Sequence, residues 1–112
     1  MRQTKTTDDA ELADFGRFSE PALLILVSLA EGPRHGYSMT EDIEAIAKVR
    51  LGPGTLYGAL ARLESRGLIE ALKSEERRNP YQLTPLGERA LRARLDSMMA
   101  VARTGQRRLA SA

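Results

Sequence analysis

Residues able to contact nucleic acid recur in the second half of the chain, beginning with the stretch GPGTLYGALAR at 52–62. Thr55 and Tyr57 carry hydroxyls that donate to phosphates or base edges, and Arg62 carries a planar guanidinium suited to phosphate or guanine. Gly58 stands among them, although a helix interior disfavours glycine by about 1 kcal/mol relative to alanine. Small residues with a few polar side chains permit a helix to approach the major groove closely. The stretch therefore predicts a DNA-recognition helix.

Further arginines follow this helix. Arg66 lies one turn after Arg62, and Arg77 and Arg78 lie in the turn of a predicted hairpin. Taken alone, Arg62 and Arg66 are better explained as a solvated basic face that pairs with Glu64 or Glu70. Arginines at the tip of a hairpin beside such a helix are placed to contact the DNA backbone or minor groove, so two basic sites together favour the DNA-binding interpretation.

The charge of the chain, +2 overall, is unevenly distributed. Residues 1–50 carry six basic and nine acidic side chains (6 − 9 = −3), whereas residues 51–112 carry eleven and six (11 − 6 = +5). The second half is therefore the anion-binding half. Fourteen of the seventeen cations are arginine, which supports phosphate binding but equally fits the codon usage of a GC-rich genome.

Composition excludes several classes of site. Without cysteine and with a single histidine, the chain offers neither a disulfide framework nor a metal site, and His35 is expected to have a structural role at a turn. We therefore expect no metal and no cofactor. An enzyme is not expected, because no phosphate loop and no paired catalytic carboxylates in an evident cleft can be found. The absence of a long uncharged apolar run predicts no membrane span and no secretory signal, and hence the cytoplasm.

Two helices are predicted before the recognition helix. Ser19 is a candidate cap and Pro21 a first-turn residue for the run ALLILVSLA, which predicts a helix that is buried on all sides. Met39, Ile43 and Ile46 are spaced by four and three residues, which predicts an amphipathic helix that packs on the first.

The recognition helix and the elements after it show equally clear periods. Leu56, Leu60 and Leu63 predict one buried seam, which places Gly58 and Arg62 on the outward face. The segments LIEALK and PYQLT then predict a two-stranded hairpin.

The last predicted helix begins at Thr84 and Pro85, a cap followed by a first-turn proline, and runs to about Arg103. Its length of roughly 28 Å is about the width of a domain this small, so dimerisation is favoured over packing on its own domain alone. The predicted dimer interface comprises Leu91, Leu95, Met98, Met99 and Ala102.

This order of elements predicts a mainly α (α+β) fold, a winged helix-turn-helix with a long C-terminal dimerisation helix. The predicted divisions are a flexible N-terminal arm over 1–18, a DNA-binding domain over 19–84, the dimerisation helix over 85–104 and a tail over 105–112.

Four motifs, taken together, resemble the PadR family of bacterial transcriptional regulators. They are His-Gly-Tyr at 35–37, Gly-Thr-Leu-Tyr at 54–57, Arg-Leu-Glu with Gly-Leu-Ile within 62–69, and Leu-Thr followed by Gly at 83–87. Each motif is weak alone, but four in the family's order, within about Ala22 to Leu91, are specific. The short single C-terminal helix is similar to the smaller of the family's subgroups.

The resemblance implies a homodimer on a palindromic operator in double-stranded DNA, with the recognition helix in the major groove and the hairpin, or wing, on the backbone. It places Tyr37 and Ser38, at the start of the second helix, near phosphates. It also implies repression and release by a small-molecule effector. The effector is left open, because the last helix has no aromatic residue to stack on a planar ligand, although Met98 and Met99 could line an apolar gap.

Asn79 and Pro80 depart from the family's wing, in which basic residues are often followed directly by two tyrosines. Pro80 has no N–H, so we expect one hairpin bond to be lost and the wing to be shorter or bent. The alternative function is a winged-helix protein–protein interaction module, whose binding would lack the steep salt dependence of DNA binding.

Overall fold

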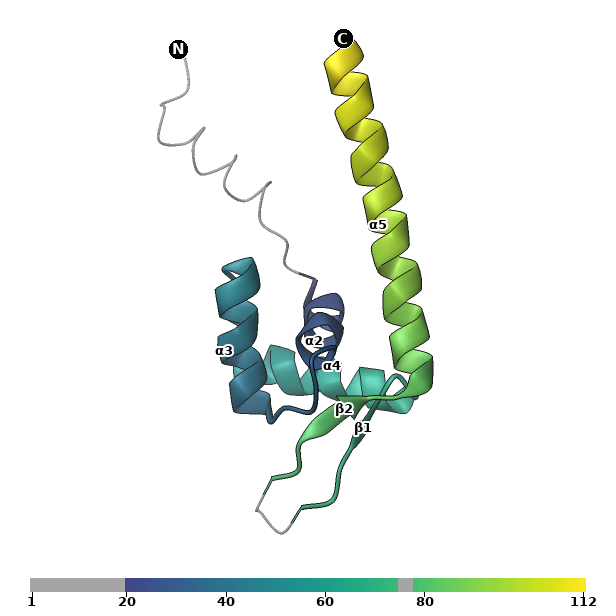
Figure 1. The fold of residues 1–112 in the computed structure, drawn as a ribbon. Helices are drawn as coiled ribbons and strands as arrows, with labels where there is room; N and C mark the ends of the chain where they lie inside the picture. Colours follow the sequence, from purple (N-terminus) through teal and green to yellow (C-terminus); the bar gives the residue numbers. More distant parts are fainter. Residues whose placement is uncertain (1–19, 75–77) are drawn as a thin grey trace, which may run out of the picture.

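The structure, a computed structural model, describes residues 20–74 and 78–112. The elements within these ranges are α2 (Pro21–Leu29), α3 (Gly36–Ala47), α4 (Pro53–Ser65), β1 (Ile69–Ala71), β2 (Tyr81–Leu83) and α5 (Pro85–Ser111). Figure 1 shows α2, α3 and α4 gathered in one body, with the hairpin projecting from one side and α5 rising from the other. The predicted winged helix-turn-helix with a long C-terminal helix is confirmed.

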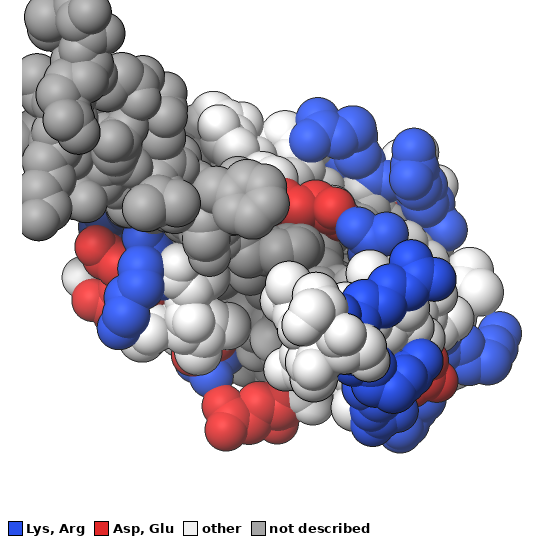
Figure 2. Space-filling view, turned by 90° about the horizontal axis from the view of Figure 1, so that it is seen from above, with Lys and Arg blue, Asp and Glu red and all other residues white. Residues whose placement is uncertain are grey.

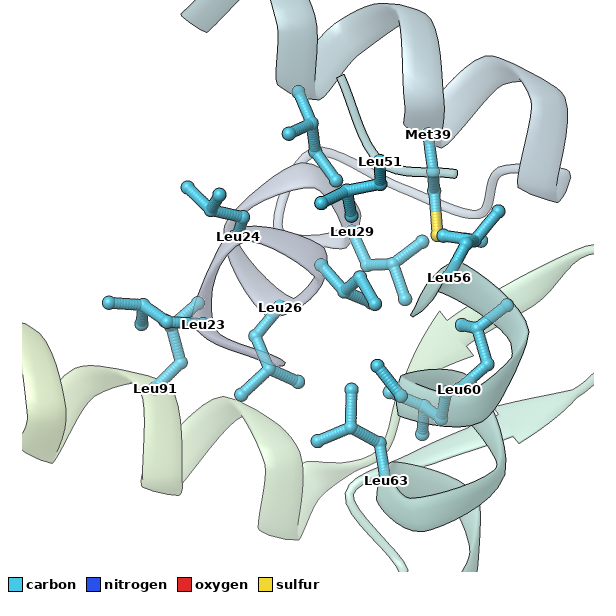
Figure 3. Close-up of a cluster of buried hydrophobic side chains, with 14 residues drawn as sticks. Leu23, Leu24, Leu26, Leu29, Met39, Leu51, Leu56, Leu60, Leu63 and Leu91 are labelled. Atoms are coloured by element: carbon cyan, nitrogen blue, oxygen red, sulfur yellow. The ribbon is translucent and has the colours of Figure 1, made fainter. Parts of the chain in front are cut away.

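Helix α2 is the centre of the core, as its unbroken apolar run predicts. Leu23, Leu24, Ile25, Leu26 and Leu29 are all buried, and the helix contacts α3, α4, α5 and β2. The predicted leucine seam of α4 faces it across the core (Figure 3). Because that seam points inward, the opposite side of α4 is turned away from the body.

Helix α2 begins at Pro21, a first-turn residue as predicted, but its N-cap residue differs from the prediction. Glu20 is the N-cap residue and its side chain makes no capping bond, while Ser19, the predicted cap, lies outside the described residues. The Glu20 carboxylate instead accepts a hydrogen bond from Arg94 of α5 at 2.8 Å. This contact joins the start of α2 to the side of the long helix.

Helix α3 buries only part of its predicted stripe. Met39 and Ile43 are fully buried, but Ile46 is 51% exposed, so its prediction as a core residue was wrong. At about 100° per residue, the core side of α3 passes through Thr40, Ile43 and Ala47, which leaves Ile46 at its edge. Buried Thr40 satisfies its hydroxyl on the carbonyl of Gly36, 3.2 Å away.

The wing is an antiparallel hairpin in which Ile69 pairs with Leu83 and Ala71 with Tyr81. Pro80 stands just before β2 and its carbonyl accepts a bond of 2.8 Å from Leu72 N–H, so the ladder continues one step beyond the strands. The predicted loss of a hairpin hydrogen bond is therefore limited to the bond that an N–H at position 80 would have donated. The wing is also attached to the body, because Arg34 and Tyr81 exchange two backbone bonds of 3.0 and 2.9 Å.

Helix α5 is longer than predicted. Thr84 caps it as expected, accepting from Gly87 N–H at 3.0 Å, but the helix continues to Ser111 instead of ending near Arg103 with a tail from 105. The tail was predicted to begin at Gly105, yet Gly105 does not adopt the left-handed conformation that ends a helix. Arg103, Gln106 and Arg107 are good helix formers, and one glycine costs a helix only about 1 kcal/mol relative to alanine, so the helix continues through Gly105. At about 1.5 Å per residue, α5 is roughly 40 Å long.

Candidate nucleic-acid interface

The outward face of α4 begins at a nearly bare helix end. The N-cap residue is Gly52, Pro53 is in the first turn, and Gly52 has no side chain to cover the first-turn N–H groups. Thr55 follows and is exposed. Free N–H groups and the positive end of the helix dipole both favour an anion here.

Gly58 and Arg62 form the middle of this face. Among the described residues, a Cβ built on Gly58 would have one neighbour within 4 Å, the Arg62 Nη1 at 3.5 Å, which is an ordinary contact. Packing within the subunit therefore does not require glycine at this position. The same distance shows that the guanidinium of Arg62 lies back along α4 over Gly58, so the cation sits above the smallest residue of the face.

Ala61, Ser65 and Arg66 complete the face, and all three are exposed. Arg66 is the C-cap residue of α4. It therefore lies at the end of the helix opposite the bare first turn, and a partner that touches both ends must follow the whole helix.

Tyr57 lies at the junction of α3, α4 and the wing. Its side chain borders two hollows, one of about 430 Å³ shared with Gly36, Tyr81 and Arg78, and one of about 310 Å³ that also includes Tyr37. The structure thus brings together three residues that were predicted separately, Tyr37, Tyr57 and Arg78. Arg77, the other predicted wing-tip cation, lies outside the described residues.

The two predicted residues at the start of α3 have different surroundings. Tyr37 is 67% exposed and lies beside the first turn of α4. Ser38 is half-buried, and its hydroxyl oxygen accepts a bond of 3.1 Å from Arg34. Within the subunit Ser38 therefore helps to hold Arg34, while its contact with DNA stays a prediction.

Arg34 is a structural residue that the sequence did not reveal. Its guanidinium donates to the Ser28 carbonyl at 3.0 Å and to Glu31 at 2.6 Å, and Asp42 lies 3.7 Å away. Together with the backbone bonds to Tyr81, these contacts connect α2, α3 and the wing. No spacing in the sequence predicts this set, because its members come from a helix end, a turn and a strand.

Tyr81 lies near Tyr57 at the base of the wing, where both residues line the same hollow. Burial raises the pKa of Tyr81 above 10.0, and Glu64 and Tyr57 raise that pKa further. The phenol is therefore uncharged near neutral pH and adds no negative charge beside the arginines. The sequence pattern predicts a strand at Tyr81 but gives this residue no part in the site.

The predicted dimer stripe on α5 is divided between the core and the surface. Leu91 is 4% exposed and packs beside Leu23 in its own subunit (Figure 3), so it does not belong to an exposed interface. Met98 packs partly on the core, whereas Leu95, Met99 and Ala102 are exposed. Seen from the side opposite the wing, Lys and Arg side chains also gather over α5 (Figure 2). None of the described helices is both long and apolar enough to cross a membrane.

Known proteins similar to this chain share both its sequence and its fold. The model of the "Transcriptional regulator PadR-like family" matches residues 25–93. A PadR family transcription regulator from Clostridium difficile R20291 superposes with a TM-score of 0.73 at 26% identity, over 81% of this chain and 99% of its own. A transcriptional regulator from Clostridium thermocellum gives 0.68 at 29% identity, over 77% and 89%. For RosR of H. salinarum the values are 0.66 at 28%, over 74% and 76%.

One curated relative is more similar in sequence. It is an uncharacterized 37.1 kDa protein in transposon TN4556 of Streptomyces fradiae, 45% identical over 82 residues. The match covers 73% of this chain but only 24% of the relative, so the chain spans about a quarter of that protein's length.

Proposed function

The chain belongs to the PadR-like family of transcriptional regulators, and from this premise we propose that it binds DNA sequence-specifically through α4. The observation that carries the proposal is the outward face of α4, where the described residues leave room for a larger side chain at Gly58. The small size of residue 58 is explained if an external surface approaches α4 closely, and the major groove of DNA is such a surface. Arg62 above Gly58 would then reach base edges, while Thr55 and the bare first turn would lie near phosphates.

The proposed DNA-bound species is a homodimer joined through α5. Past Leu91, the same side of the helix carries Leu95, Met98, Ala102, Gly105 and Leu109, spaced by three and four residues. This is the period with which two helices pack along one seam, and the small residues Ala102 and Gly105 would permit a close approach. Two copies of α4 held by that seam would meet half-sites roughly 34 Å apart, as in a palindromic operator.

We also propose repression as the regulatory outcome, in keeping with the family resemblance. A dimer that covers two half-sites would compete with other proteins for promoter DNA. Release by a small-molecule effector is the accompanying expectation. A promoter–reporter fusion containing the bound sequence, with and without the protein, distinguishes repression from activation by the direction of the change.

DNA selection followed by a salt series tests the proposal. Purified protein is mixed with random-sequence duplexes, the bound fraction is sequenced, and the selected duplex is used in gel shifts at two salt concentrations. A DNA-binding dimer should select a two-fold symmetric sequence and lose affinity with a slope of about 0.9 for each phosphate neutralised. No shift at low salt, together with salt-insensitive binding to a protein, would instead identify an interaction module.

A further inference from the structure

Two sequence motifs, His-Gly-Tyr and Gly-Thr-Leu-Tyr, meet in space at Gly36 and Tyr57. A Cβ built on Gly36 would lie 2.8 Å from the Tyr57 hydroxyl oxygen, 3.3 Å from the Tyr57 Cζ and 3.4 Å from the Leu56 Cδ2. The first distance is shorter than real Cβ contacts, so a side chain at 36 would force the tyrosine to move. Gly36 is buried beneath these two residues.

Space, and not backbone conformation, explains this glycine. Gly36 is the first residue of α3 and is absent from the positive-φ glycines of the described chain, which are Gly32 and Gly67. Alanine would therefore fit the local backbone. Since the closest atom is the far end of a side chain that can rotate, alanine would displace Tyr57 without obstructing the main chain.

We propose that Gly36 is a positioning residue for DNA binding. Because Gly36 has no side chain, the Tyr57 ring can lie across the start of α3, and this position of the ring is called the seat of Tyr57. This inference rests on the proposed function of α4. In this seat the phenol lies between the recognition helix and the wing, bordering the hollow that Arg78 and Asn79 also line. A DNA strand that passes from α4 to the wing must cross this junction, and the Tyr57 hydroxyl would meet one of its phosphates there.

A double-mutant cycle tests the coupling between the two residues. Gly36→Ala, Tyr57→Phe and the double variant are compared with the wild type by titration of the selected duplex. Each single variant should weaken binding about 10- to 100-fold, the range for losing one hydrogen bond to a charged group. If Gly36 acts by seating the hydroxyl, the double variant should bind no more weakly than Tyr57→Phe. Multiplying losses, or an unchanged affinity for either single variant, would overturn the proposal.

A second measurement separates this inference from the proposed function. In the free wild-type protein, NMR should show a nuclear Overhauser effect between the Tyr57 ring and the Gly36 α protons, and Gly36→Ala should weaken contacts of the ring while circular dichroism keeps its helical spectrum. Absence of the effect in the wild type would refute the seat itself. A protein that shows the effect but binds no duplex would refute DNA binding and leave the seat intact.

Discussion

At the scale of single residues, Gly58 and Arg62 are the positions where the fold and the proposed function make opposite demands. A helix would be more stable with alanine at 58, and nothing in the part of the chain that the structure describes prevents this change. The Arg62 guanidinium lies over this glycine. Both residues are explained by a partner that approaches α4 from outside, and each gives a prediction.

Replacing Gly58 with alanine should move stability and DNA affinity in opposite directions. The helix should gain roughly 0.5–1 kcal/mol in free energy of unfolding, because alanine restricts the unfolded chain and suits a helix. The added methyl should weaken binding to the selected duplex at least several-fold, since it occupies the proposed clearance. Denaturant unfolding and duplex titration measure the two effects.

The matched control for Gly58→Ala is Ala45→Gly, on the exposed part of α3. It should lower the unfolding free energy by a similar amount and leave DNA affinity unchanged. Full affinity in Gly58→Ala would show that α4 does not approach DNA as closely as proposed.

Arg62→Ala should weaken specific binding by ~1 to 3 kcal/mol if the guanidinium reads a base. The loss should then shrink on duplexes changed at the contacted base pair, whereas a phosphate contact would give a uniform loss on every sequence. The control is Arg92→Ala on α5, whose side chain is exposed and lies 3.6 Å from Glu88. Wild-type binding by Arg62→Ala, measured by titration on the duplex panel, would remove Arg62 from the interface.

At the scale of elements, the periodic patterns of the sequence predicted the features that depend on residues close together in the chain. The seam of α4, the hairpin and the Thr84 cap depend on neighbours within a few residues, and each is confirmed. The contacts of Arg34 and the seat of Tyr57 join distant segments, so no single period contains them. The end of α5 was predicted too early for another reason. A glycine ends a helix only where the chain leaves the helical conformation at that residue.

The joint between α4 and α5 illustrates such a distant contact. Thr84 donates its hydroxyl to the Gly67 carbonyl at 2.6 Å, and its N–H donates to the Leu68 carbonyl at 3.1 Å. A Cβ on Gly87 would overlap that same Leu68 carbonyl oxygen. The first turn of α5 is therefore held directly against the chain that leaves α4.

Gly87→Ala should consequently destabilise the fold by about 3 kcal/mol, the upper end for overpacking, because backbone blocks the added methyl. Gly54→Ala is the control, since a Cβ there meets nothing within 4 Å and should change stability by no more than about 0.5 kcal/mol. Urea unfolding at one fixed protein concentration compares them, so that any association contributes equally. Equal midpoints for the two variants would show that α5 is not held at this joint.

At the scale of the whole molecule, the described chain places its two proposed surfaces on opposite sides. The wing and α4 lie at one end and α5 extends away from them (Figure 1), with Lys and Arg side chains gathered over it (Figure 2). Leu91 attaches the base of α5 to the core, while Leu109, near its far end, is 79% exposed. An apolar seam that begins in the core and continues into solvent is unusual for a helix that acts alone, and a second copy would cover it.

Two alanines on α5 allow a matched test of this arrangement. At about 100° per residue, Ala102 lies on the seam that starts at Leu91, whereas Ala100 lies roughly 180° away, and both are exposed. Ala102→Glu should place a charge between the paired helices and give the mass of one chain in sedimentation, while Ala100→Glu should keep twice that mass. Because two half-sites then act independently, Ala102→Glu should also bind a single half-site normally but lose the advantage of the full operator. A dimer that tolerates glutamate at 102 and dissociates with glutamate at 100 would place the interface on the opposite face of α5.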